Sequence, residues 1–237
     1  VNLSKQTHII ASNIDYCFLF VTPSNPNTST LFIDRVLLST KSFGIETIIL
    51  FNKIDIYSKE DIEYIDDLFN TYTKIGYQCL KISVKKRVNI YKVENFMNNN
   101  VSVFTGHSGV GKTSLMNVLD SELNLKTSEI SKQNEQGQHT TTFAEMFDLN
   151  NGAKIIDSPG IKGFGLIDIK KSEIGGFFPE IASLSSDCKF NNCLHYNEPN
   201  CAIKKALENN QISNFRYKNY LSLLNNDEDN FRTNSFK

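Results

Sequence analysis

The stretch GHSGVGKT, residues 106–113, decides the fold of this chain. It follows the apolar run Val101–Thr105, which predicts a strand, and it leads into a segment that predicts a helix from about Lys112. A glycine-rich turn in that position lets backbone N–H groups surround phosphate oxygens, and the helix N-terminus adds favourable partial charge. We expect Lys112 to reach the β- and γ-phosphates and Thr113 to ligate Mg²⁺. The predicted phosphate-binding residues are Gly106, His107, Ser108, Gly109, Val110, Gly111, Lys112, Thr113 and Ser114.

Strand-like and helix-like segments alternate around this loop. This rhythm predicts an α/β fold with a parallel sheet and helices on both of its faces. A polar segment without periodicity, residues 126–138, is expected to be a mobile loop. Strands are expected at 17–21, 46–51, 78–83, 101–105, 143–149 and 154–157, and helices at 31–43, 58–75 and 93–97 and from about 112.

Length and composition predict two domains in a soluble protein. The chain has 237 residues, of which 40% are hydrophobic and 22% charged, and its pattern changes after Phe164. We expect a nucleotide-binding domain over residues 1–170 and a small, mostly helical domain over 171–237. No apolar stretch is long enough to span a membrane and no secretion signal is evident, so a cytoplasmic monomer without a membrane partner is expected. The net charge of −1 means that any RNA contact would need a local patch.

Base selection is predicted from Asn52-Lys53-Ile54-Asp55, which directly follows the strand at 46–51. The Asp55 carboxylate can accept two hydrogen bonds from the N1–H and N2 amine of guanine, which adenine cannot supply. Asn52 can brace the surrounding loops while the stem of Lys53 packs on the face of the base. A backbone amide at Ser83-Val84 suits the guanine carbonyl. These residues favour GTP and GDP as ligands over ATP, and they oppose an ATPase or a small-molecule kinase.

Two further segments are expected near the phosphates. Asp157 ends a predicted strand and would hold Mg²⁺ through water, and the N–H of Gly160 would sense the γ-phosphate. In His139-Thr140-Thr141-Thr142 one threonine is expected to close over Mg²⁺, with Thr142 and Thr141 the better candidates. His139 is either a surface loop histidine or the group that orients the attacking water, because Ile161 stands where many GTPases place a glutamine.

Four candidate metal ligands cluster near the C-terminus. Cys188, Cys193, His195 and Cys201 offer three thiolates and one imidazole, the tetrahedral set expected for one structural Zn²⁺. The module that carries them has too little core to fold well without the ion.

The motifs occur in a rearranged order. The base motif and Ser83 precede the phosphate loop, and Asp157 comes last, so the site of a GTPase is retained with its chain circularly permuted. The segment after Asp157 then leads directly into the C-terminal module.

In this order and in its motifs, the sequence resembles the circularly permuted ribosome small-subunit GTPase family, often called RsgA or YjeQ. The residues that carry the resemblance span most of the chain: 10–15, 32–35, 52–55, 106–114, 137–142, 157–160, 164–166 and the zinc-ligand pattern.

The resemblance implies GTP hydrolysis stimulated by the small ribosomal subunit during its late maturation, with contacts to its rRNA. Members usually begin with an OB-fold that grips ribosomal RNA, and no such barrel pattern precedes Thr7 in this sequence. Either the gene lacks the barrel or it lies outside this chain, which leaves the intrinsic affinity for RNA open. A non-hydrolysing scaffold that binds GTP and docks through its zinc domain remains the alternative.

Overall fold

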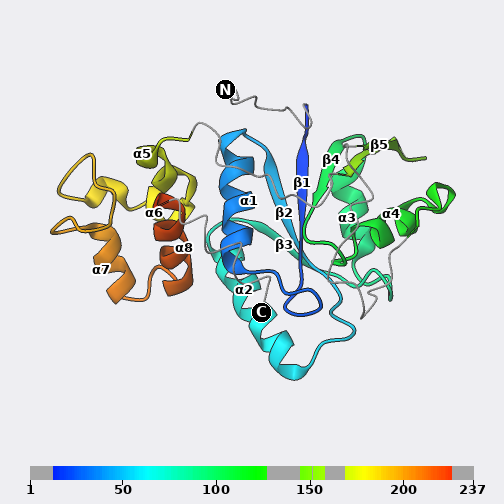
Figure 1. Cartoon of the computed structure of the whole chain (residues 1–237), viewed down its shortest axis with the longest axis horizontal. Coiled ribbons are helices and arrows are strands. Elements are labelled where there is room, and N and C mark those ends of the chain that lie inside the picture. Colours follow the sequence, from blue (N-terminus) through cyan, green and yellow to red (C-terminus); the bar gives the residue numbers. More distant parts are fainter. Residues whose placement is uncertain (1–12, 127–144, 151, 158–168, 226–237) are drawn as a thin grey trace, which may run out of the picture. The chain divides into compact units, whose positions relative to one another are not determined.

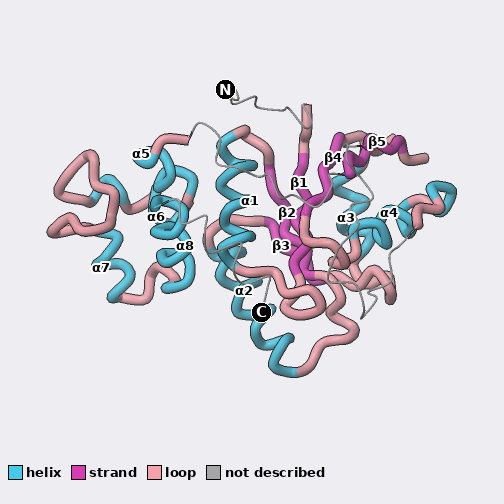
Figure 2. The backbone as a smooth tube through the Cα atoms, viewed as in Figure 1, coloured by secondary structure: helices cyan, strands magenta, loops and turns pink. Residues whose placement is uncertain are grey.

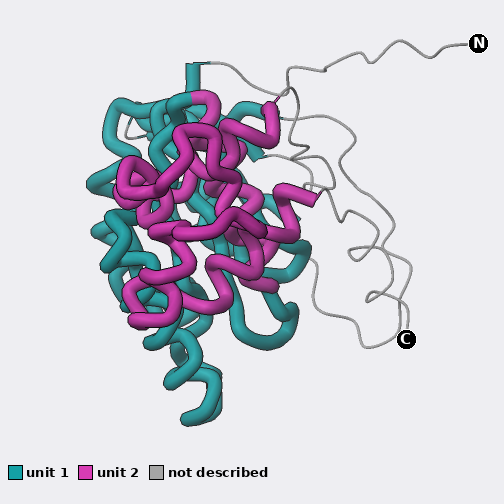
Figure 3. Tube along the Cα trace, turned by 90° about the vertical axis from the view of Figure 1, so that its left-hand side faces the viewer, with its two compact units in different colours: residues 1–28, 44–167 teal, residues 29–43, 168–237 magenta. Residues whose placement is uncertain are grey.

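The computed structural model describes residues 13–126, 145–150, 152–157 and 169–225. The chain divides into two compact units: Val1–Thr28 with Gly44–Ile167, and Ser29–Phe43 with Asp168–Lys237 (Figure 3). Helix α1 (Thr30–Ser42) therefore groups with the C-terminal residues, although strands of the first unit flank it in the sequence. The domain limits at 170 and 171 stay a prediction.

The strands of the described residues form one sheet in the first unit (Figures 1 and 2). Its order is β3-β2-β1-β4-β6-β5, and every neighbouring pair is parallel except β5 and β6. The sheet confirms the predicted α/β class, and its antiparallel edge matches the expected strand pair. The strands are β1 (Tyr16–Val21), β2 (Glu46–Phe51), β3 (Gln78–Lys81), β4 (Val101–Thr105), β5 (Glu145–Asp148) and β6 (Lys154–Asp157).

Helices of the first unit cover both faces of this sheet. Phe18 and Phe104 lie on the face that packs with α3 (Ile90–Met97) and α4 (Lys112–Leu119). On the opposite face, the ring of Phe51 packs 6.0 Å from that of Phe69 in α2 (Lys59–Lys74). Because successive side chains of a strand point to opposite faces, the unbroken apolar runs of the sequence supply both layers of core.

The ends of these helices follow local chemistry. The side chain of Ser58 caps α2 by accepting a hydrogen bond from the N–H of Asp61, as the sequence predicts. Gly44 has φ +70° and directly follows Phe43, the C-cap residue of α1, which is where a left-handed glycine commonly ends a helix. Strand β3 ends at Lys81, two residues earlier than expected, because Ser83 pairs with Val88 in a separate bridge.

The second unit is helical where the structure describes it. None of the described helices is long and apolar enough to cross a membrane. Besides α1, the second unit contains α5 (Lys171–Ile174), α6 (Pro179–Ala182), α7 (Ala202–Glu208) and α8 (Asn214–Asn225). Short 3-10 turns cover Gly175–Phe177 and Ser185–Asp187 in the same unit. In the first unit, a 3-10 turn at Ser121–Leu123 follows α4.

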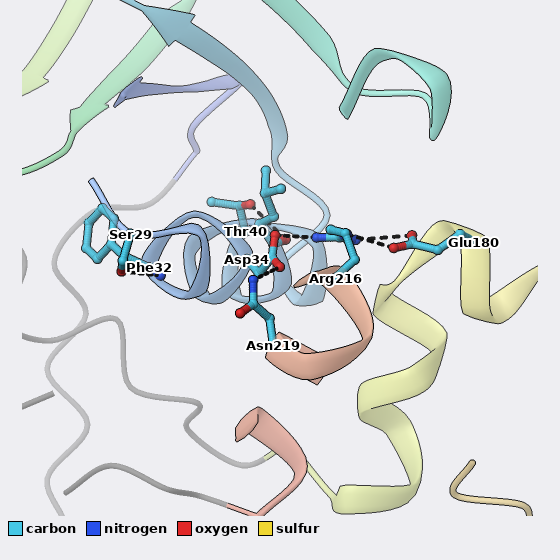
Figure 4. A network of polar contacts seen from close by, with 8 residues as sticks. Ser29, Phe32, Asp34, Thr40, Glu180, Arg216 and Asn219 are labelled. Atoms are coloured by element: carbon cyan, nitrogen blue, oxygen red, sulfur yellow. Dashed lines mark hydrogen bonds and ion pairs between the residues drawn. The ribbon is translucent and has the colours of Figure 1, made fainter. Parts of the chain in front are cut away.

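A buried polar network ties α1 to α6 and α8 inside this second unit (Figure 4). Arg216 donates to Asp34 and, with two of its nitrogens, to the carboxylate of Glu180 at 2.7 and 3.1 Å. Asn219 donates to the second oxygen of Asp34 at 2.6 Å. The guanidinium also lies 4.5 Å from the ring centroid of Phe178. Each carboxylate thus has charged or polar partners, which buried charges require.

Candidate functional site

The predicted nucleotide residues follow strands that run in the same direction. The register pairs Val21 with Phe51, Phe51 with Lys81 and Phe104 with Asp157, so these strands end at one edge of the sheet. In an open parallel sheet the edge formed by the carboxyl ends is the usual place for a ligand.

The phosphate loop approaches its neighbours too closely for side chains at two glycines. A Cβ at Gly106, where φ is +142°, would lie 2.9 Å from the carbonyl oxygen of Phe20. A Cβ at Gly111, where φ is +105°, would lie 2.4 Å from the side-chain nitrogen of Asn52. The left-handed backbone and the contacts both require glycine, so this turn can present its backbone to a phosphate.

The ammonium group of Lys112 lies over its own loop. Its Nζ donates to the carbonyl oxygens of Gly106 at 2.7 Å and His107 at 3.0 Å. Burial lowers the pKa of Lys112, and the charge of Asp157 opposes that shift. Burial, and next the charge of Lys112, also lower the pKa of His107. The arrangement places one cation inside the loop, where the predicted phosphates would bind.

Asp157 ends β6, and one of its two carboxylate oxygens has no hydrogen-bond donor among the described residues. Within the described part of the chain its Oδ1 is buried and has no hydrogen-bond partner. Burial raises the pKa of Asp157, the charge of Lys112 opposes the shift, and Glu145 adds to it. Thr113 and Ser114 lie half-buried in the first turn of α4, and Ser108 is exposed in the loop. A buried carboxylate oxygen without a hydrogen-bond partner, at the end of the strand that pairs with β4 beside the phosphate loop, fits a hard cation such as Mg²⁺.

Asn52 joins the base motif to both neighbouring loops. It is 1% exposed, its Nδ2 donates to the carbonyl of Val110 at 2.8 Å, and its Oδ1 accepts from the N–H of Val84 at 3.3 Å. The bracing role expected of Asn52 therefore has a geometry in which one side chain holds the phosphate loop and the loop after β3. The amide of Ser83 donates to Val88 at 3.3 Å, so both amides proposed for the guanine carbonyl have partners here.

The other residues of the predicted guanine-binding motif are held in place by short hydrogen bonds of their side chains. Ser83 Oγ donates to Asp55 Oδ1 at 2.5 Å, which orients an exposed carboxylate. Lys53 has φ +67°, and its Nζ donates to the carbonyl of Asn25 at 2.6 Å. Burial lowers the pKa of Lys53 and Asp55 opposes that shift. Sequence reasoning missed Asn25, because nothing in the local pattern of its loop connects it with Lys53.

Several predicted residues cannot be placed. His139, Thr141, Thr142, Gly160 and Ile161 lie outside the described residues, as does most of the segment 126–138. The roles assigned to them stay predictions.

The four predicted metal ligands lie together in the second unit. The ligand atoms of Cys188, Cys193, His195 and Cys201 are all within 4.8 Å of one another. His195 Nδ1 lies 3.5 Å from both Cys188 Sγ and Cys201 Sγ, which are 4.0 Å apart. A tetrahedral zinc ion, about 2.3 Å from sulfur and about 2.0–2.1 Å from nitrogen, separates sulfur from nitrogen by about 3.5 Å and two sulfurs by about 3.8 Å. The cluster has the dimensions of a zinc site.

Two residues around the cluster orient its histidine. The hydroxyl of Ser185 donates to the carbonyl of Ile181 at 2.7 Å, and its oxygen lies 3.2 Å from His195 Nε2. Nε2 must therefore carry the proton, which leaves the Nδ1 lone pair directed at the thiols. The Glu198 carboxylate accepts from three backbone N–H groups of the turn around His195, at 2.8, 2.8 and 3.1 Å. Sequence spacing could have suggested Glu198, but Ser185 is brought in by packing.

Comparisons with known proteins agree on one family. The model of the RsgA GTPase family matches residues 2–167. The chain is 53% identical to a protein of Flavobacterium psychrophilum, over 100% of this chain and 72% of that protein. It is 54% identical to one of Flavobacterium johnsoniae, over 100% of this chain and 73% of that protein. Both relatives are named small ribosomal subunit biogenesis GTPase RsgA.

Two solved structures share the fold. The crystal structure of YjeQ from Thermotoga maritima superimposes with a TM-score of 0.78 at 31% identity, covering 90% of this chain and 71% of that one. The crystal structure of YloQ, described as a circularly permuted GTPase, gives a TM-score of 0.73 at 29% identity, covering 92% of this chain and 69% of that one.

Proposed function

This chain belongs to the RsgA GTPase family and is a circularly permuted GTPase, and on that premise we propose that the small ribosomal subunit stimulates its GTP hydrolysis during late maturation of that subunit. The observation that carries the proposal is Asn52, which bridges the phosphate loop and the loop after β3 at the sheet edge where a nucleotide would bind. The printed names of relatives that are 53% and 54% identical across the whole chain support the ribosomal partner.

Under this proposal each residue of the edge has one task. Asp55, oriented by Ser83, accepts from the N1–H and N2 amine of guanine, and the stem of Lys53 covers the face of the base. Lys112 exchanges the carbonyl oxygens of its loop for the β- and γ-phosphates. The negative charge of the phosphates then offsets the cost of burying the ammonium group of Lys112. Mg²⁺ at Thr113 and Asp157 would neutralise charge on the β- and γ-phosphate oxygens.

The zinc cluster is proposed to hold the C-terminal module in one conformation. Its ligands lie in loops and at the start of α7, and short helices around them supply little core of their own. We propose that the protein acts on ribosomal subunits and their rRNA in the cytoplasm. We also propose that it does so as a monomer.

A non-hydrolysing scaffold is the alternative, because Ile161 is not a water-orienting residue. The deciding experiment measures steady-state phosphate release with and without purified small ribosomal subunits. We expect slow turnover alone and faster phosphate release in the presence of the subunits. Lys112→Ala should abolish the stimulated rate, whereas Lys154→Ala, a matched loss of charge at an exposed β6 residue, should leave it intact. Subunit binding that depends on GTP, without stimulated phosphate release, would establish the scaffold instead.

A further inference from the structure

The loop between β3 and α3 carries a concentrated positive charge. Lys85, Lys86 and Arg87 form the longest run of basic residues in the sequence, in a chain whose net charge is −1. All three are exposed, and half-buried Lys92 follows in the first turn of α3. Within the part of the chain that the structure describes, none of the four forms an ion pair. The charge is therefore available to a partner.

The backbone presents these side chains at a tight turn. Ser83 and Val88 pair across the base of the loop, and the N–H of Arg87 donates to the carbonyl of Val84 at 3.3 Å. Lys85 and Lys86 are the central residues of that turn and form its tip. Arg87 has φ +54°, a conformation that glycine adopts without penalty and arginine does not. Arginine at such a position has a backbone cost, which points to a use for its side chain outside the fold.

An exposed aromatic ring lies beside Lys92. Tyr91, in the first turn of α3, is 58% exposed, and the Nζ of Lys92 lies 5.9 Å from its ring centroid. An exposed ring beside a lysine can stack on a nucleobase while cations of the same surface contact phosphates, the combination found in surfaces that bind unpaired nucleic acid. An acidic protein would meet the same charges, and stacking of an unpaired base on the ring is the contact that is particular to nucleic acid.

We propose that Lys85, Lys86, Arg87, Tyr91 and Lys92, here called the basic tip, form a docking surface for RNA with at least one unpaired base. The cations contact phosphates, and the base stacks on Tyr91. This inference rests on the proposed function, which makes the rRNA of the small subunit the available partner. It adds the surface that a chain of near-zero net charge needs for such a contact.

The basic tip is joined to the base motif by two hydrogen bonds. The N–H of Lys86 donates to Ser83 Oγ at 3.0 Å, and the same hydroxyl donates to Asp55 Oδ1 at 2.5 Å. RNA that moves the tip therefore acts on the carboxylate predicted to select guanine. Because coupling between two ligands is reciprocal, guanine nucleotide and RNA should change each other's affinity by the same factor.

Salt dependence tests the phosphate contacts. The equilibrium dissociation constant of the full chain, loaded with a non-hydrolysable GTP analogue, is measured for small ribosomal subunits and for naked 16S rRNA between 50 and 200 mM KCl. Two lost contacts should reduce the slope of log affinity against log salt by about 1.4–1.8. Across this range wild-type affinity should then fall about sevenfold to twelvefold more than that of Lys85→Ala/Lys86→Ala. The control, Lys59→Ala/Lys74→Ala, loses the same charge at the two ends of α2. Equal slopes for both double variants would overturn the proposal.

Two further variants separate recognition from folding. Arg87→Gly relieves the left-handed backbone, so the thermal midpoint should hold or rise while RNA affinity falls. Tyr91→Ala should weaken binding about fivefold or more, and Tyr91→Phe should restore it, because the ring is retained. Unchanged RNA affinity in both Arg87→Gly and Tyr91→Ala would refute the surface.

The outcomes also distinguish this proposal from the proposed function. If subunits stimulate wild type and the tip variants alike and all bind RNA equally, the basic tip is wrong and the function stands. If tip variants lose affinity for subunits but keep it for naked rRNA, the tip docks on a ribosomal protein and the RNA assignment is wrong. If wild type binds naked rRNA through the tip but subunits do not stimulate phosphate release, the proposed function fails and the tip remains.

Discussion

Replacing Arg216 by methionine should destabilise the second unit strongly. The residue is 2% exposed, and the change leaves the carboxylates of Asp34 and Glu180, which are 0% and 7% exposed, without their cation. Removing one partner of such a buried pair costs about 3–5 kcal/mol, because the remaining charges are left desolvated. That cost corresponds to an increase of about two to nearly four orders of magnitude in the opening equilibrium.

Hydrogen exchange of backbone amides in α8 measures this opening in the full chain. Arg216→Met should accelerate exchange of the most protected amides by that factor. Lys218→Met makes the same change two residues along the helix at an exposed position and should alter exchange by less than about threefold. The triple variant Asp34→Leu/Glu180→Met/Arg216→Met should recover most of the protection, since no buried charge then remains unpaired.

Two results would refute this reasoning. Equal exchange in Arg216→Met and Lys218→Met would show that the network contributes nothing to stability. A triple variant less protected than Arg216→Met would show that the loss comes from packing and not from unpaired charge.

Other predictions concern the nucleotide and the metal. Asp55→Asn should make the protein prefer XTP over GTP in competition binding, because each lost charge-assisted bond costs about 1.5–3 kcal/mol; a retained preference for GTP would show that the site is misassigned. Burial raises the pKa of Asp157, so its ionised form destabilises the nucleotide-free fold at neutral pH, and this cost fades as the pH falls toward about 4. Asp157→Asn should therefore raise the thermal midpoint at pH 7 more than at pH 4 and lose the extra protection by Mg·GTP; a lower midpoint at pH 7 would contradict this. Cys193→Ser should reduce zinc from about one ion per chain and loosen the second unit while GTP binding persists, and full zinc content would remove Cys193 from the ligand set. His139→Ala, assayed with saturating subunits, should lower only the stimulated rate of phosphate release, and intact stimulation would make His139 a bystander.

Sequence reasoning reaches furthest where the chemistry is local. The phosphate loop and the Asn52 motif each place their candidate groups within a few residues, and the Cys188–Cys201 pattern places four within one short segment, so spacing alone predicts what they can bind. Strand β2 was predicted to the residue, because a buried parallel strand is an unbroken apolar run between polar ends. The permuted order of these motifs, read directly from the chain, already excluded an ordinary GTPase connectivity.

The misses arose where a partner lies far away in the sequence. Strand β3 ends early because Ser83 turns to pair with Val88 and to hold Asp55, and no propensity records that competition. Ser185 reaches His195 because short helices pack around the cluster. Asn25 meets Lys53 because two loops end at the same sheet edge.

By itself the sequence determined the residue types of the site, the order of its motifs and the α/β rhythm, because periodicity and motif spacing are properties of neighbouring residues. Only the tertiary structure decided that α1, which lies between two strands of the first unit in the sequence, groups with the C-terminal helices. Asp34 is a carboxylate on the buried side of that helix, and Arg216, 182 residues later, supplies the charge that permits it to be there. A buried ion pair depends on two residues whose meeting is decided by the packing of the whole unit, and local patterns contain no record of that meeting.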